Sequence, residues 1–447
     1  MPELWPHSDA RLPRLASVWF SGCDWQWSSI PPVGRRHAIV TSRLPRLIDP
    51  HAAWLAALWA AVSQAGHNHS VLVVGHGTAG ESLLRRAAHR AGVPFVELWE
   101  SATAGFPNES MSVEHLVVRV RPIPSRGVFA NSNDSDDWRN TPERDRAVIA
   151  WADEVIALRV RAGGNLHVLL RDRLRAGVGG VLLAELPGET PTPVRDELLA
   201  LGAQVWSLNE NELKLPLPKG EKGEVDTCEA SFASRLRSLP EADGWEFLTH
   251  TTRACPGAWP RQSEDDYLDS LLDGRGDADH SALGTLIRIV TQRRLCASNR
   301  LIRGGHRVVS FTAVPLVELP TLHRYRGHLA RWDFEPYGIC LRREWLERCG
   351  TRRVLYGGEA EWGVTPAADQ PFFQCVRELD RVTWSGGAPP DTIDWSAERE
   401  WRHLGDLDLS NATPNDVLLF VPTRDDARRL ASVCPWSITI VNTMQGT

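Results

Sequence analysis

Between residues 37 and 208, short apolar runs alternate with stretches of helical spacing. The apolar runs have the length of buried strands and are expected at His37–Val40, Val71–Val74, Pro94–Leu98, Glu154–Val160, Val181–Leu186 and Gln204–Leu208. The intervening stretches predict helices at Pro50–Ala65, Glu81–Ala91, Thr141–Ala152 and Leu166–Arg175. Strands that alternate with helices form βαβ units, so this region predicts an α/β domain, a parallel sheet with helices on both faces.

The flanking regions have different patterns. Residues 1–36 are rich in Trp and Pro and are expected to be an irregular extension, as is the stretch from about 100 to 140. Residues 209–242 are assigned as a linker, because their first half holds every lysine of the chain together with prolines and acids. Residues 243–447 contain strand-like runs separated by irregular connections, which predicts an α+β domain with a mixed or antiparallel sheet.

Composition limits the class of protein. The chain has 447 residues, of which 42% are hydrophobic and 24% charged, so it is globular and has two or three domains. It has no apolar run long enough to cross a bilayer and no signal-peptide core, so a cytoplasmic protein with no membrane partner is expected. A net charge of -6 argues against a generally basic nucleic-acid coat but allows a local basic cleft. The eight cysteines form no C-x-x-C pair, so they are expected to be free thiols and no metal is expected.

Three predicted strand ends carry residues suited to phosphate. They are Thr41, Ser42 and Arg43 after the first strand, the GHGTAG turn with Gly75, Gly77 and Thr78 after the second, and Arg161, Gly163 and Gly164 later in the chain. Glycines let the backbone approach a ligand, and a helix that begins there offers unpaired N–H groups and a favourable dipole. The carboxyl ends of parallel strands meet at one edge, so these residues are expected to converge. Glycines that serve only tight turns are the simpler alternative.

The segments AIVTSR, VLVVGHGTAGESLLRRAAHRAGVPFVEL and DRAVIAWADEVIALRVRAGGNLHVLL together resemble the SLOG superfamily. That group includes DNA-processing protein A and lysine-decarboxylase-like nucleotide hydrolases. The resemblance covers residues 37–208 and implies a Rossmann-like domain that binds a nucleotide, a nucleotide-derived signal or single-stranded DNA. GHGTAG replaces the usual Gly-Gly-x-x-G, and the hydrolase motifs are missing, so hydrolysis by this domain is not implied.

Three polar clusters stand out in the second region: FLTHTTR around His250, VVSFT around Ser310, and DWSAEREWR with Glu398 and Glu400. If E-R-E lies in a strand, its two glutamates point to one face, where paired carboxylates suit acid/base chemistry or a cationic transition state. Taken alone, the motif is better explained as a solvated strand edge, and His250 as a structural histidine.

The order of these clusters resembles the ADP-ribosyltransferase superfamily, and the block Val308–Gly357 resembles the AbiGi-type abortive-infection family. The resemblance implies NAD as the substrate, with Glu400 stabilising the ribosyl cation, Glu398 positioning the acceptor and His250 fixing the ribose. The implied NAD-binding residues are His250, Thr251, Arg253, Ser310, Thr312 and Tyr337.

The leading hypothesis is therefore a bacterial anti-phage defence protein. In it, a SLOG-like domain senses a nucleotide or nucleic-acid signal and gates an NAD-using ADP-ribosyltransferase-like domain. An alternative is a non-catalytic protein of antitoxin or DNA-processing type that binds a nucleotide or single-stranded DNA, with a degenerate C-terminal module. A third hypothesis, catalysis by the N-terminal site itself, is least favoured because no acid is plainly placed beside its glycines. The acceptor macromolecule and the formation of a homo-oligomer are left open.

Overall fold

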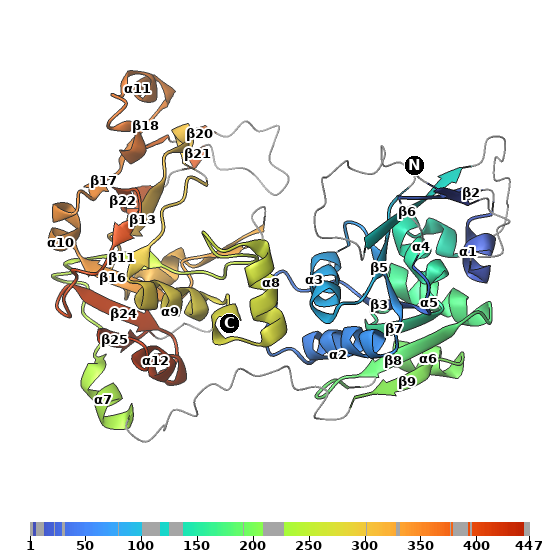
Figure 1. Ribbon diagram of the computed structural model, residues 1–447. Coiled ribbons are helices and arrows are strands. Elements are labelled where there is room, and N and C mark those ends of the chain that lie inside the picture. Colours follow the sequence, from blue (N-terminus) through green and yellow to red (C-terminus); the bar gives the residue numbers. More distant parts are fainter. Residues whose placement is uncertain are drawn as a thin grey trace. The chain divides into compact units, whose positions relative to one another are not determined.

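The computed structural model describes residues 3–5, 13–21, 23–28, 32–78, 80–100, 117–124, 137–190, 192–208, 228–300, 302–327, 331–375, 377–378, 392–393 and 396–441. The chain forms two compact units, shown in Figure 1. Unit 1 comprises Met1–Gly220 and Gln262–Ala278, and unit 2 comprises Glu221–Arg261 and Asp279–Thr447. None of the described helices combines the length and apolar character needed to cross a membrane.

Unit 1 is built on a nine-stranded sheet of order β1-β2-β6-β5-β4-β3-β7-β8-β9. Its strands are β1 (Glu3–Trp5), β2 (Cys23–Trp27), β3 (Arg36–Thr41), β4 (Val71–Gly75), β5 (Phe95–Leu98), β6 (Val117–Pro124), β7 (Glu154–Arg159), β8 (Gly180–Glu185) and β9 (Gln204–Ser207). The strands from β6 through β3 to β9 pair in parallel, whereas β2 and β1 add antiparallel strands at one side. This confirms the predicted parallel sheet.

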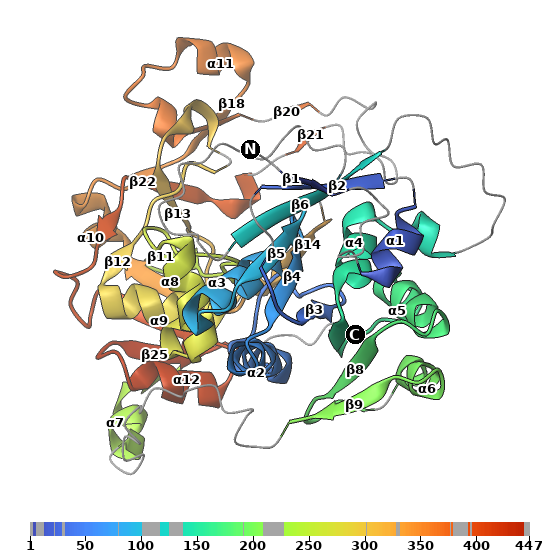
Figure 2. The ribbon, with the colours of Figure 1, turned by 45° about the vertical axis from the view of Figure 1, so that its right-hand side comes forward.

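Helices cover both faces of this sheet. Figures 1 and 2 show α2 (Ala53–His67) and α3 (Glu81–Ala91) on one face. The other face carries α1 (Arg14–Trp19), α4 (Glu143–Trp151), α5 (Asn165–Arg175) and α6 (Pro193–Ala200). A further helix of this unit, α8 (Glu264–Asp273), pairs with α3 through Arg86, whose guanidinium contacts Asp269 and Asp265.

Two predictions for unit 1 are wrong. The N-terminal extension is not wholly irregular, because it supplies β1, α1 and β2, and Trp25 and Trp27 of β2 are buried against Trp151. The stretch from 100 to 140 contains β6 and the 3-10 helix η1 (Asp137–Asn140). Tryptophan is a large apolar side chain, and here burial of three rings fixes the edge of the sheet.

Unit 2 is built on an eight-stranded mixed sheet of order β10-β25-β24-β16-β11-β13-β22-β17. Its strands are β10 (Leu236–Arg237), β11 (Phe247–Thr251), β13 (Val308–Thr312), β16 (Gly338–Arg342), β17 (Arg352–Arg353), β22 (Glu400–Leu404), β24 (Val417–Val421) and β25 (Ser437–Ile440). All neighbours are antiparallel except β10, β25 and β24, which run parallel. The mixed sheet agrees with the expected α+β architecture.

Smaller elements surround this sheet. The helices are α7 (Cys228–Arg235), α9 (Ala282–Gln292), α10 (Arg343–Arg348), α11 (Glu359–Val364) and α12 (Arg424–Ala431), with the 3-10 helices η3 (Gly276–Ala278, in unit 1), η4 (Arg303–Gly305), η5 (Leu319–Leu322), η7 (Gln370–Phe372) and η8 (Ser396–Glu398). Two-stranded pairs join β12 (Arg294–Leu295) to β23 (Leu407–Asp408), β14 (Arg324–Arg326) to β15 (Arg331–Asp333), β18 (Leu355–Gly357) to β19 (Phe373–Cys375), and β20 (Arg377–Glu378) to β21 (Thr392–Ile393). The first part of the expected linker, residues 209–227, lies outside the described residues.

Candidate functional site at the carboxyl edge of the unit 1 sheet

The strand order of unit 1 reverses at β3. The chain runs outward from β3 through β4, β5 and β6 on one side, then returns to place β7, β8 and β9 on the other side. In open parallel sheets, ligands bind beyond the carboxyl ends of the strands at such a switch point. The three predicted strand ends follow β3, β4 and β7, which are neighbours here, so the structure brings these residues to one edge.

The ends of β3 and β7 are tied together by hydrogen bonds. Ser42 donates its backbone N–H to the Arg159 carbonyl at 2.8 Å, and the Ser42 hydroxyl oxygen accepts from the Arg161 backbone N–H at 2.9 Å. The Thr41 hydroxyl donates to the Ser42 carbonyl at 3.1 Å. These bonds fix the backbone between the two strands, while the side chains of Arg43 and Arg161 are exposed.

The turn after β7 leads into the N-terminus of α5. Gly163 has φ +67°, a conformation that glycine adopts without strain, and its N–H donates to His167 Nδ1 at 3.2 Å. Gly164 is the N-cap of α5, and neither a capping side chain nor an acidic residue occupies the first turn. The positive end of this helix dipole therefore faces no protein carboxylate within the helix itself.

The turn after β4 differs, because a carboxylate of the protein already occupies it. Gly77 has φ +70°, and its N–H donates to Glu81 Oε2 at 2.5 Å. Thr78 is also engaged, since its hydroxyl donates to the Gly75 carbonyl at 2.9 Å. The Gly77 N–H and the Thr78 hydroxyl are therefore already used by groups of the protein.

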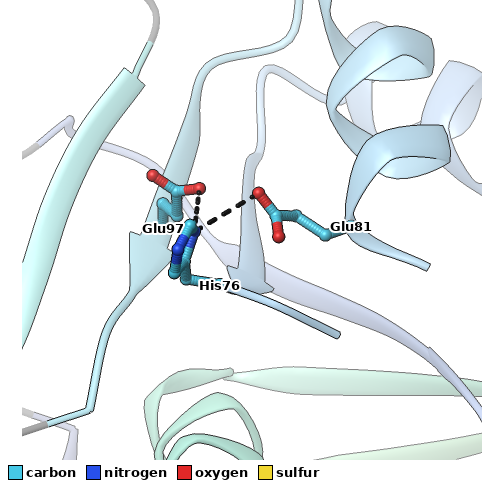
Figure 3. Close-up of side chains that lie close together, drawn as sticks. All are labelled: His76, Glu81 and Glu97. Carbon is cyan, nitrogen blue, oxygen red and sulfur yellow. Dashed lines mark hydrogen bonds and ion pairs between the residues drawn. The ribbon is translucent and has the colours of Figure 1, made fainter. Parts of the chain in front are cut away.

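Three side chains that sequence reasoning did not select meet beside this turn. Figure 3 shows His76, Glu81 and Glu97 pointing toward one another from the end of β4, the start of α3 and β5. His76 Nδ1 lies 3.2 Å from Glu97 Oε1 and 3.5 Å from Glu81 Oε1. Two sequence features could have indicated this cluster: a histidine inside GHGTAG and an acid at the end of the next strand.

Glu97 is held in its ionised form by its surroundings. Its side chain is 1% exposed, and it accepts a hydrogen bond from Trp99 Nε1 at 3.0 Å. Burial raises the pKa of Glu97, but hydrogen bonds with Glu81 and Trp99 and the charge of Arg85 outweigh it, so the pKa lies below its usual value. A carboxylate only accepts hydrogen bonds, so His76 presents Nδ1–H to it.

His76, Glu81 and Glu97 are also a candidate metal centre, because one ligand atom from each lies within 4.8 Å of the others. However, Arg85 Nη1 already lies 3.4 Å from Glu81 Oε1 and 3.9 Å from Glu97 Oε1, where it balances the carboxylate charge. The arrangement is thus a hydrogen-bond and ion-pair network that joins His76, Glu81, Glu97 and Arg85.

A second polar group bridges the β4 and β7 turns. Arg144 at the start of α4 donates to the Gly77 carbonyl at 3.1 Å, and its Nε lies 3.6 Å from Asp145 and 3.9 Å from Glu100. Burial raises the pKa of Asp145, while Arg144 and a hydrogen bond with Asn165 oppose that rise. Arginines therefore follow β3 and β7 and acids lie at β4 and β5, while the Asp145 carboxylate reaches the start of α5 through Asn165.

In unit 2, the pairing register places His250 and Glu400 on opposite faces of the sheet. Thr312 is the register partner of both Thr249 and Glu400, so these three side chains share one face of the sheet. His250 follows Thr249 and projects from the opposite face, where its ring contacts Phe311. The prediction that His250 and Glu400 line one cleft is wrong. Thr249 shares the face of Glu400, and His250, the next residue along β11, projects from the other face.

Both residues are also engaged elsewhere. His250 Nδ1 donates to the Ser310 carbonyl at 2.8 Å, and burial lowers the pKa of His250 to about 4, so it is a neutral, partly buried histidine. Glu400 forms two hydrogen bonds with Arg402, at 2.9 and 3.0 Å, and the Arg402 side chain is 2% exposed. The same guanidinium donates to the Pro371 and Phe373 carbonyls and to Gln374.

The E-R-E motif does not lie in one strand. Glu398 ends η8, Arg399 has φ +45°, and β22 begins at Glu400. The two carboxylates are nevertheless close enough to interact, and burial together with the Glu400 charge raises the pKa of Glu398 to about 7. The prediction of a strand with both glutamates on one face is wrong, because the left-handed residue between them breaks it.

Other residues of the predicted NAD site contact neighbouring residues of unit 2. Thr312 donates its hydroxyl to the Glu398 carbonyl at 2.5 Å, and Tyr337 donates to Asp426 of α12 at 3.2 Å. Thr251 pairs with Gly338 at the end of β11, and burial lowers the pKa of Arg253. The side chains of Thr312 and Tyr337 thus form hydrogen bonds within unit 2.

Comparisons with known proteins give structural matches alone. No protein-family model matches the chain, and no curated protein matches it. DNA processing protein A from Streptococcus pneumoniae is similar to its N-terminal half, with a TM-score of 0.31 and 14% identity over 46% of this chain and 70% of that chain. DNA processing protein A from Helicobacter pylori, a structure that addresses single-stranded DNA binding, is similar with a TM-score of 0.31 and 15% identity over 46% of this chain and 90% of that chain. A likeness this distant shows neither a shared function nor a shared ligand.

Proposed function

We propose that unit 1 binds the phosphate groups of a nucleotide or of single-stranded nucleic acid at the carboxyl edge of its sheet. The observation that carries the proposal is the junction of β3 and β7, where Ser42 and Arg161 are joined by a hydrogen bond at the switch point. Phosphate is recognised by guanidinium groups and by helix N-termini, and both occur at this junction.

The charge distribution supports this position. Among the described residues, the guanidinium groups of Arg43 and Arg161 form no ion pair, whereas neighbouring Arg159 pairs with Glu189. The uncapped N-terminus of α5 lies on the same connection as Arg161. A phosphate between the ends of β3 and β7 would meet the two guanidinium groups and the positive end of the α5 dipole.

The leading hypothesis from the sequence goes further than ligand binding by unit 1, because it adds a role in anti-phage defence and an NAD-using effector in unit 2. With His250 and Glu400 on opposite faces, the geometry supports ligand binding by unit 1 better than group transfer from NAD by unit 2. The function we infer is therefore that of a nucleotide- or nucleic-acid-binding protein. Its biological setting is left to experiment.

The test measures binding of a labelled single-stranded oligonucleotide to the full chain by fluorescence anisotropy, with nucleoside triphosphate and pyrophosphate as competitors. Arg161→Glu should weaken binding at least about tenfold, since it replaces a charge-assisted contact with repulsion. The matched control is Arg175→Glu, an exposed arginine at the other end of α5, which should stay within about twofold.

The competitors separate the two sources of phosphate. Displacement by the nucleoside triphosphate at low concentration would assign the site to a free nucleotide, and displacement by longer oligonucleotides alone would assign it to nucleic acid. Unchanged binding by Arg161→Glu and Arg43→Glu would contradict the proposed site.

A further inference from the structure

The geometry points to His76 as a general base at the carboxyl edge, oriented by Glu97, so that unit 1 hydrolyses a phosphoester of the ligand it binds. This inference rests on the proposed phosphate site and adds a reaction to it. The objection that no acid stands beside the glycine turn is removed by the fold, because β5 brings Glu97 to the end of β4.

The His76 ring is fixed in two ways. It stacks on Trp99 with ring centroids 3.7 Å apart and an interplanar angle of 4°, and its Nδ1 lies 3.2 Å from Glu97 Oε1. Trp99 in turn donates to the second oxygen of Glu97, so one carboxylate orients both rings. Such a buried carboxylate selects the tautomer in which Nδ1 carries the proton.

The other ring nitrogen, Nε2, then carries the lone pair. The His76 side chain is 42% exposed, in contrast to the buried carboxylate behind it, so water and ligand can reach the ring. His76 follows β4, and Arg161 follows β7 two strands away, which is about 10 Å at the usual strand spacing. A ligand that extends from a phosphate at the β3–β7 junction toward β4 would bring its next ester group to His76.

The reaction is a hydrolysis. His76 Nε2 accepts a proton from a water molecule as the water oxygen forms a bond to phosphorus. The bond between phosphorus and the ester oxygen breaks, and the leaving alcohol takes the proton back from Nε2. Water supplies the only added atoms, and no oxidant or reductant is needed. General-base catalysis of this kind contributes about a hundredfold or more to a rate.

The experiment incubates the full chain with nucleoside mono-, di- and triphosphates and with single-stranded oligonucleotides in water enriched in heavy oxygen. The expected product carries one heavy oxygen on the phosphate. His76→Asn should reduce turnover at least about a hundredfold, because asparagine can still donate to Glu97 but cannot accept the proton. His89→Asn, an exposed histidine in the last turn of α3, is the matched control and should remain within about twofold of wild type.

Glu97 is a positioning residue, so its variant needs a readout beyond loss of activity. Glu97→Gln should shift the pH profile of turnover and change the nitrogen NMR signals of His76, because the fixed tautomer is lost. A variant with an unchanged pH profile and unchanged His76 signals would overturn the role of Glu97.

Other outcomes test whether His76 is the general base. Absence of turnover for every ligand that binds, full activity of His76→Asn, or cleavage of a glycosidic bond in place of the phosphoester would each overturn the inference. Activity abolished by a chelator, with metal binding lost in His76→Asn, would replace the base by a metal centre. Binding measured in the same samples separates this result from failure of the phosphate site, which depends on Arg161.

Discussion

The polar side chains selected from the sequence have different surroundings in the two units. In unit 1, the selected residues lie at the ends of parallel strands, and the side chains of Arg43 and Arg161 are exposed there. In unit 2, they lie within antiparallel strands and are already bonded, as Glu400 is to Arg402. A strand end faces solvent whichever way its side chains alternate, whereas a residue inside a strand faces whichever side the register dictates. Function is therefore easier to locate at strand ends.

Removal of Arg402 should give the largest effect, because this side chain is buried and bonds to Glu400, Gln374 and two carbonyls. Arg402→Met leaves the Glu400 carboxylate without its partner and should lower the free energy of unfolding of unit 2 by about 3–5 kcal/mol. Chemical denaturation measures this. Arg353→Met, on the exposed neighbouring strand, is the control. A loss below about 1 kcal/mol would mean that unit 2 does not depend on this bonded network.

The pH dependence of stability tests whether Glu398 of unit 2 is partly buried and coupled to its neighbours in the folded state. Its pKa is raised from 4.5 to about 7, so the folded state binds this proton more tightly than the unfolded state. Its contribution to stability is complete below pH 4.5 and is lost as the pH rises through about 7. Glu398→Gln should flatten this fall and stabilise unit 2 by about 1–2 kcal/mol at alkaline pH.

Thermal or chemical unfolding across this pH range checks the Glu398 prediction. Glu347→Gln, an exposed glutamate on α10, is the control and should leave the pH dependence as it is in wild type. The same slope in Glu398→Gln and wild type would show that the Glu398 proton is not coupled to folding.

Backbone strain offers a smaller test in unit 1. Gly163 has φ +67° with open space around the position of a Cβ atom, so a side chain costs conformational energy and no steric clash. Gly163→Ala should cost about 1 kcal/mol and Gly163→Asn less, because asparagine tolerates the left-handed region better than alanine. Denaturation curves compare the two variants. Equal stability of all three proteins would mean that the turn rearranges when glycine is replaced.

The smallest expected effect concerns NAD. Because His250 and Glu400 project from opposite faces, wild type and Glu400→Gln should release no nicotinamide from labelled NAD, with or without nucleic acid. Chromatography of the labelled products measures this. Release by wild type that is lost in Glu400→Gln would restore the NAD hypothesis for unit 2 and contradict the contrast drawn between the units.

Sequence patterns located most of the unit 1 sheet, since β4 is a continuous apolar run and α3 has a period of 3.6 residues, and short windows reveal both patterns. They missed β2, which pairs with β1 and with the distant β6, and whose burial depends on Trp151 far along the sequence. They converged on the strand ends but missed the partnership of His76 with Glu97. In unit 2 they failed because the face of His250 depends on pairing with a strand about 60 residues away.

The most direct test is hydrogen–deuterium exchange of the full chain with and without a saturating single-stranded oligonucleotide or nucleoside triphosphate. Protection should appear at Thr41–Arg43 and at the start of α5, with little change in β11 and β22. Protection confined to β11 and β22, or absent from the β3 and β7 ends while ligand is bound, would contradict binding at the carboxyl edge of unit 1.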